Sequence, residues 1–125
     1  VEDFSLENAD LRTARWYYDM LAVFSKSKLI HEHHPHVDDP LKAWEDEHRH
    51  DPPLNESREM INEIGEGFSN YLVETNPYLY RSICSSLPND EFGYDLTETV
   101  LEMERSLIRE GAVSPVGTRI IAKNL

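Results

Sequence analysis

The sequence has a single cysteine, which excludes an internal disulfide and bears on the redox state of the compartment in which the protein folds. Among 125 residues, Cys84 stands alone, so no disulfide can form within the chain. A chain of this size that needs no disulfide is typical of a reducing compartment, and we expect a cytoplasmic or similarly reducing location. Because free cysteine is among the most buried residue types, we interpret Cys84 as a small core residue.

Long apolar runs and common catalytic signatures are also missing. The longest apolar run, Met20–Phe24, is far shorter than the roughly 18 residues that a membrane span needs. No charged-then-apolar secretory leader opens the sequence. Glycine is sparse, and neither Gly-x-Ser-x-Gly nor His-Glu-x-x-His occurs. We therefore predict no membrane contact and no reaction for the chain by itself, although it could serve as the small subunit of an enzyme.

Basic side chains are few, and the acidic excess is concentrated in one segment. The chain has 24 acidic and 12 basic side chains, which gives a formal net charge of −12. Residues 31–67 hold eleven acids and three bases, whereas residues 1–30 and 68–125 have net charges of only −1 and −3. All six histidines lie between positions 31 and 50. This balance disfavours direct binding to nucleic acid or to an anionic membrane.

Apolar residues recur mainly at helical spacing, and the pattern predicts an all-α fold. We expect one domain over residues 1–125, built as a small bundle of four main helices and a short acidic helix. An acidic, histidine- and proline-rich segment at 31–53 connects the first helix to the rest, and an extended tail covers 112–125. The main helices are expected from about Ser5 or Asn8 to Ile30, from Asn55 to Leu72, from Pro77 to Leu87 and from Leu96 to Arg109, with the short one from Pro40 to His50.

Capping residues set these expected boundaries. Asp39-Pro40 and Asn76-Pro77 each place an N-cap acceptor before a proline at the first helical position. The segment 95–98 resembles a capping box, and Gly111 suits the position just after a helix end. The turn expected at 114–117 is followed by 118–121, which could form a short strand or an extended docking segment.

The first helix is unusually apolar. The nine residues Trp16–Phe24 contain one charged side chain, Asp19. Such a helix is typical of a core centre or of a surface that a partner covers. We expect Asp19 to pair with Arg15 one turn earlier. The alternative is a carboxylate that points into a pocket among the neighbouring aromatic residues.

The leading functional hypothesis is a non-catalytic helical interaction module, most simply a small subunit of a hetero- or homo-oligomeric assembly. Aromatic side chains are favoured interface anchors, and they concentrate on the first helix and at 71–80. The tail is partly apolar and extended. The predicted contacts to a protein partner, or to a second copy of the chain, are Trp16, Tyr17, Phe24, Arg119, Ile120 and Ile121.

The clustered histidines support a competing hypothesis, a hydrolytic or oxidative enzyme that uses zinc, iron or nickel. Imidazoles and carboxylates are the ligands that such metals prefer. The spacing of Glu45 and His48 matches that of di-iron bundles, but the later helices hold no histidine to complete such a centre. The candidate ligands are His31, His34, His36, Glu45, His48 and His50.

Two further interpretations stay open. The histidines could be solvated side chains of an acidic segment, where nearby carboxylates favour the protonated imidazole and give a response to pH. The acidic surface could also act as a decoy for a nucleic-acid-binding protein.

Overall fold

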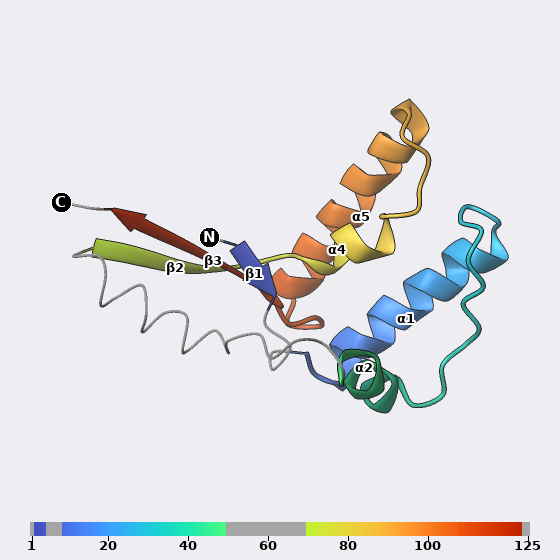
Figure 1. Cartoon of the computed structure of the whole chain (residues 1–125), viewed down its shortest axis with the longest axis horizontal. Helices are drawn as coiled ribbons and strands as arrows, with labels where there is room; N and C mark the ends of the chain where they lie inside the picture. The colour runs from blue at the N-terminus through green and yellow to red at the C-terminus, as the bar shows by residue number, and fades with distance from the viewer. Residues whose placement is uncertain (1, 5–8, 50–69, 124–125) are drawn as a thin grey trace.

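The structure, a computed structural model, describes residues 2–4, 9–49 and 70–123. Helix is the main secondary structure of these residues, as predicted. The order along the chain is β1 (Glu2–Phe4), α1 (Leu11–Lys26), α2 (Pro40–His48), β2 (Asn70–Asn76), α4 (Leu79–Ile83), α5 (Glu91–Arg109) and β3 (Gly117–Lys123) (Figure 1).

A three-stranded antiparallel sheet was not predicted. Its order is β1-β3-β2, so the C-terminal strand lies in the middle. Glu74 pairs with Arg119, and Asn76 pairs with Gly117. β2 and β3 extend away from the helices (Figure 1). Of the two alternatives for 118–121, a short strand or an extended docking segment, the structure shows a strand, which lies within β3.

The sheet also corrects a predicted helix. Tyr71 and Leu72 were expected at the end of a helix from Asn55, but they lie in β2. The segment 70–76 contains tyrosine, valine and threonine, which favour strands. Its backbone pairs with β3, some fifty residues later in the chain, and local periodicity does not report that pairing. The remainder of the predicted helix, 55–69, falls outside the described residues.

α1 begins and ends inside its predicted range. Asp10 is the N-cap, and its carboxylate accepts a hydrogen bond from the Thr13 backbone nitrogen at 2.9 Å. The helix ends at Lys26, and Lys28 then takes a positive φ of 60°. The predicted end at Ile30 is therefore wrong, and the predicted start at Ser5 or Asn8 falls outside the described residues. One side of α1 is buried, whereas Val23 on the other side is 54% exposed.

α2 matches its prediction closely. Asp39 is the N-cap, its carboxylate accepts from the Lys42 nitrogen at 3.2 Å, and Pro40 occupies the first helical turn. Trp44 is 4% exposed and anchors α2 against α1. The connection before α2 is held on α1 by Arg15, which donates to the carbonyl oxygens of Val37 at 2.6 Å and Asp38 at 3.1 Å.

α5 starts one turn earlier than predicted. Asp90 rather than Asp95 is the N-cap, and its carboxylate accepts from the Gly93 nitrogen at 2.9 Å. Local spacing favoured position 95 because an acid three residues later completes the capping-box pattern. Gly111 has a φ of 75°, which confirms its predicted place just past the helix end.

α4 is shorter than predicted and has an unexpected cap. It spans only Leu79–Ile83, and the expected cap residue Asn76 lies in β2 instead. Glu104 of α5 is fully buried and accepts hydrogen bonds from the backbone nitrogens of Tyr78 (2.9 Å), Leu79 (3.1 Å) and Tyr80 (2.8 Å). Burial raises the pKa of Glu104, and the three amide bonds offset part of that rise. A carboxylate thus joins α5 to the start of α4.

The core lies among α1, α2, α4 and α5. Its buried members include Ala14, Tyr17, Leu21, Phe24, Ile30, Trp44, Leu79, Ile83, Cys84, Val100 and Val116. Cys84 is 7% exposed, which confirms its interpretation as a core residue. Across the parts of the chain that the structure describes, none of the helices has the length and apolar character needed to span a membrane.

Candidate functional site

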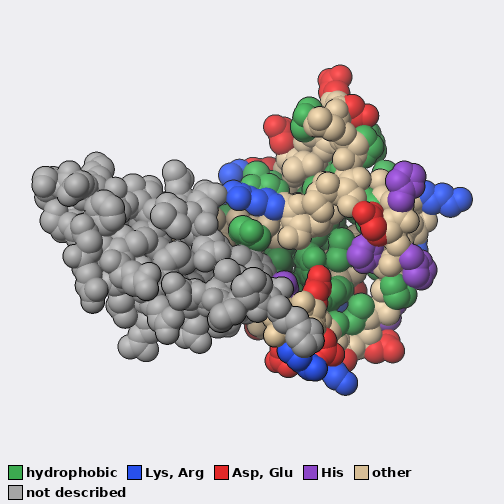
Figure 2. Space-filling model, viewed as in Figure 1, with side chains coloured by type: hydrophobic (Ala, Val, Ile, Leu, Met, Phe, Trp, Pro, Cys, Tyr) green, Lys and Arg blue, Asp and Glu red, His purple; other side chains and the backbone are tan. Residues whose placement is uncertain are grey.

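A cleft of about 560 Å³ opens between α1 and α4. It lies within the range of about 300–1,000 Å³ that is usual for small-molecule sites. Figure 2 shows the hollow on this face, with hydrophobic side chains inside it and acidic and histidine side chains around it. The walls come from α1, the connection to α2, the end of α2 and the α4 region. The lining side chains belong to Tyr17, Tyr18, Leu21, Ile30, Glu32, His34, Glu47, Arg81, Ser82, Ile83, Ser85 and Ser86.

Two tyrosines of α1 form the aromatic part of the cleft. Tyr17 is buried and packs edge-on against both Tyr18 and Trp44, with ring centroids 5.0 and 5.5 Å apart. Burial, followed by the nearby charge of Glu47, raises the pKa of Tyr17 to about 12. Both effects disfavour the phenolate, so this hydroxyl stays neutral at physiological pH.

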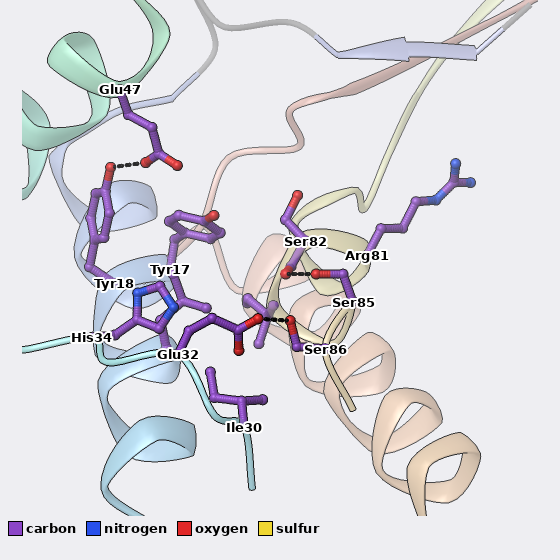
Figure 3. Close-up of a pocket in the computed structure, with 12 residues that line it drawn as sticks. Tyr17, Tyr18, Ile30, Glu32, His34, Glu47, Arg81, Ser82, Ser85 and Ser86 are labelled. Carbon is purple, nitrogen blue, oxygen red and sulfur yellow. Dashed lines mark hydrogen bonds between the residues drawn. The ribbon is translucent and has the colours of Figure 1, made fainter. Parts of the chain in front are cut away.

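Glu47 brings α2 to the cleft. The Tyr18 hydroxyl donates to Glu47 Oε2 at 2.5 Å (Figure 3). Burial and this hydrogen bond raise the pKa of Tyr18 well above its usual value. The other carboxylate oxygen of Glu47 has no hydrogen bond among the residues that the structure covers. Glu47 therefore offers a free acceptor at the cleft.

Glu32 joins the two walls. It lies on the connection between α1 and α2, and its Oε1 accepts a hydrogen bond from the Ser86 hydroxyl at 2.8 Å (Figure 3). The pKa of Glu32 is lowered by a hydrogen bond from its own backbone nitrogen, by the Ser86 bond and by the nearby histidines at positions 31 and 34. This carboxylate is therefore ionised at neutral pH.

Arg81 lies at the edge of the cleft, but its cationic group points away from the carboxylates (Figure 3). Its guanidinium carbon lies 5.4 Å from the Tyr78 ring centroid and 5.8 Å from that of Tyr80. Its Nε also donates to the Tyr80 hydroxyl at 3.2 Å. The aromatic residues thus hold Arg81 outside the space between Glu32 and Glu47.

Comparison with known proteins assigns no family to this geometry. The chain matches no protein-family model, and no curated protein or solved structure is detectably similar to it. The chemistry of the cleft and of the exposed surface is therefore the basis for a functional assignment.

The predicted metal ligands are dispersed over the described surface. Of the six, His34 is the one that lines the cleft, while His31, His36 and Glu45 are exposed. His48 packs on Trp44 with ring centroids 4.7 Å apart, and His36 Nε2 lies 3.7 Å from Asp38 Oδ1. Within 2–4, 9–49 and 70–123, no three His, Cys, Asp or Glu side chains form a group that could hold a metal ion. His50 lies outside those ranges, and the metal hypothesis stays a prediction.

Two of the predicted partner contacts are covered by the chain itself. Tyr17 is 8% exposed and Phe24 is 3% exposed, because both pack into the core. Trp16 is half-buried and lines a second hollow of about 470 Å³ between α1 and the end of α5. The other predicted contacts belong to β3, where the structure gives the backbone pairing: Arg119, Ile120 and Ile121.

The second hollow is also where Asp19 lies. Its carboxylate lines that hollow and lies 3.9 Å from the guanidinium of Arg15, which confirms the predicted pair. Both side chains are partly exposed, and a pair of this kind contributes about 0.3–0.5 kcal/mol. Asp19 is thus a rim residue rather than an unpaired buried charge.

A row of apolar side chains on α5 includes two that are exposed. Val100 and Glu104 of this helix are buried, whereas Met103 is 40% exposed. Phe92 is 55% exposed, and Leu96 is half-buried between them. These residues share one side of the helix because their separations are close to whole turns.

Sequence patterns located part of the cleft. The acidic, histidine- and proline-rich segment at 31–53, which contains the predicted metal ligands, also supplies Glu32 and Glu47. No local signal connects this segment to Ser86, which lies 54 residues from Glu32 in the sequence. Packing of α4 against α1 creates that contact, so the cleft emerges only in the folded chain.

Proposed function

We propose that this protein is a non-catalytic interaction module, a subunit of a larger assembly, which binds a basic amphipathic segment of a partner protein along α5. The observation that carries this proposal is the exposure of Phe92 and Met103 on one side of α5, with the half-buried Leu96 between them. Aligned, exposed aromatic and methionine side chains are typical of interaction surfaces. In Figure 1 the N-terminal half of α5 projects beyond the neighbouring elements, where a partner has access.

The charge beside the apolar row favours a basic partner. A second row on α5 consists of exposed acids spaced at i, i+4, i+7 and i+11, namely Glu91, Asp95, Glu98 and Glu102. Arg105 pairs with the last of them. A partner that places apolar side chains on the first row would bring basic side chains to the second. The formal charge of −12 adds long-range attraction for the same partner.

Site-specific crosslinking tests this proposal. A photoreactive benzoyl-phenylalanine replaces Phe92 in one protein and Tyr94 in the control. Tyr94 is also aromatic and is 59% exposed, but two residues turn it about 200° around the helix. In an extract of the source cells, we expect an adduct from position 92 and none from position 94. Mass spectrometry should identify the crosslinked segment as basic and amphipathic.

Affinity measurements then test the contact itself. The crosslinked segment, made as a peptide, should bind the wild type, and Phe92→Ala/Met103→Ala should weaken binding about tenfold or more. Tyr94→Ala should leave the affinity unchanged, and added salt should lower it. Adducts from both positions, an acidic crosslinked segment or a second copy of this chain as the crosslinked protein would each contradict the proposal.

A further inference from the structure

We infer that the cleft between α1 and α4 binds a small uncharged carbonyl compound, whose oxygen accepts a hydrogen bond from the Tyr17 hydroxyl and whose apolar body rests on the core residues around it. This site is separate from the α5 surface in both residues and chemistry. It would give the interaction module a ligand of defined class.

The Tyr17 hydroxyl is a polar group on a buried side chain, and it points into the cleft. Tyr17 is only 8% exposed, and no group among residues 2–4, 9–49 and 70–123 forms a hydrogen bond with its hydroxyl. In Figure 3 the ring reaches from α1 toward the α4 wall, with the hydroxyl oxygen at its leading end. Buried polar groups are almost always hydrogen-bonded, so this hydroxyl calls for a partner that enters the cleft.

The surroundings of this hydroxyl are apolar. Tyr17, Leu21, Ile30 and Ile83 all line the cleft and all belong to the core, with exposed fractions of 8%, 7%, 5% and 1%. These four residues form the floor of the cleft. The other lining residues are polar and are half-buried or exposed, so they form its rim. An apolar floor with one directed polar group is a usual construction of a small-molecule site.

The protonation state of Tyr17 selects the class of ligand. Its pKa of about 12 keeps the hydroxyl protonated, so it offers an O–H donor. The negative charge of Glu47 acts on the same group and disfavours a carboxylate or a phosphate as the acceptor. An ammonium group has no acceptor atom and cannot receive the bond. An uncharged carbonyl oxygen accepts it and brings no donor that the apolar floor would leave unpaired.

Three compounds of similar shape test the ligand class. Acetophenone has a neutral carbonyl, benzoate replaces its methyl group with a charged oxygen, and 1-phenylethylamine replaces its carbonyl oxygen with an ammonium group. Each is titrated into the isotope-labelled wild type at about pH 7 and followed by amide NMR shifts. We expect saturable shifts from acetophenone, centred on the cleft, with a Kd of about 1 mM or lower, and at least about tenfold weaker binding of both charged compounds.

Two outcomes of this titration would overturn the inference. Binding of benzoate or of the amine as tight as that of acetophenone would show that the cleft does not select a neutral acceptor. Absence of saturable shifts from acetophenone would show that solvent alone satisfies the hydroxyl. Because this comparison uses the wild type, it decides the inference whether or not a variant folds.

Tyr17→Phe then tests the contact itself, because it removes only the hydroxyl. It should weaken acetophenone binding about fivefold or more. Tyr94→Phe is the matched control, since it removes a phenolic hydroxyl that bonds Asn89 at an exposed position, and it should bind like the wild type. Circular dichroism checks that both variants are folded. Unchanged affinity in Tyr17→Phe, or equal weakening in both variants, would overturn the inference without affecting the proposed α5 interaction.

Discussion

The Thr13 hydroxyl oxygen lies 2.8 Å from the backbone nitrogen of Ser114, although 101 residues separate them in the sequence. Thr13 is fully buried. Its hydroxyl accepts the Ser114 hydrogen bond and donates its own proton to Asp10 Oδ1 at 2.6 Å. Asp10 is also the N-cap of α1. A single hydroxyl therefore connects the start of α1 with the segment that follows α5.

Removing this hydroxyl should destabilise the fold. Thr13→Val keeps the shape of the side chain but leaves the Ser114 nitrogen and part of the Asp10 carboxylate without their partner. We expect a loss of about 1–3 kcal/mol in the free energy of unfolding. Thr99→Val is the matched control, because Thr99 is exposed and its hydroxyl bonds only within α5. Urea unfolding measures both variants, and equal losses would contradict the proposed role of Thr13.

Glu104 should be the most sensitive acidic residue of the described chain. Glu104→Ala leaves three backbone N–H groups at the start of α4 without an acceptor, and we expect a loss of about 3 kcal/mol or more. Glu104→Gln keeps one carbonyl acceptor and should lose less. Glu102→Ala, at an exposed position, should change stability by less than about 0.5 kcal/mol. A Glu104→Ala protein as stable as the wild type in urea would show that this cap contributes nothing.

Tyr17 and Tyr18 should ionise late in the folded protein. The pKa of Tyr17 is raised from 10.0 to about 12 by burial, and that of Tyr18 is raised further by burial and its bond to Glu47. The unfolded chain ionises these groups near pH 10, so their contribution to stability is complete below that pH and falls as pH rises through the folded values. Ultraviolet titration of phenolate in native and urea-containing buffer measures the difference. Tyr17→Phe should remove the step near pH 12, and superimposable native and denatured curves would refute the prediction.

Cys84 should be unreactive until the protein unfolds. It is 7% exposed, and burial raises the pKa of its thiol, which lowers the thiolate fraction at neutral pH. A thiol-specific chromogenic reagent should therefore react slowly in native buffer and fully in urea. Cys84→Ala serves as the blank. Rapid, complete labelling of the native protein would show that this side chain is accessible.

Local sequence determined those elements whose stabilising contacts lie within about one helical turn. The Asp39-Pro40 start of α2, the Gly111 end of α5 and the Arg15–Asp19 pair were all predictable for this reason. The same local logic failed where two acids offered alternative caps, since Asp90 rather than Asp95 begins α5. A cap is chosen by the whole path of the chain, and spacing alone does not distinguish the candidates.

Tertiary structure decided the features that join distant segments. β3 lies at the centre of the sheet and pairs with both β1 and β2. Both pairings join segments far apart in the sequence, so local periodicity does not predict them. Packing covers Tyr17 and Phe24, which the sequence presented as partner contacts, and it leaves Phe92 and Met103 exposed instead. Composition determined that this chain is acidic and cannot form an internal disulfide, and the spacing of its apolar residues predicted that it is mainly helical. Only packing decided which carboxylates face a cleft and which one caps a helix, because burial and hydrogen-bond geometry arise between residues that the sequence keeps far apart.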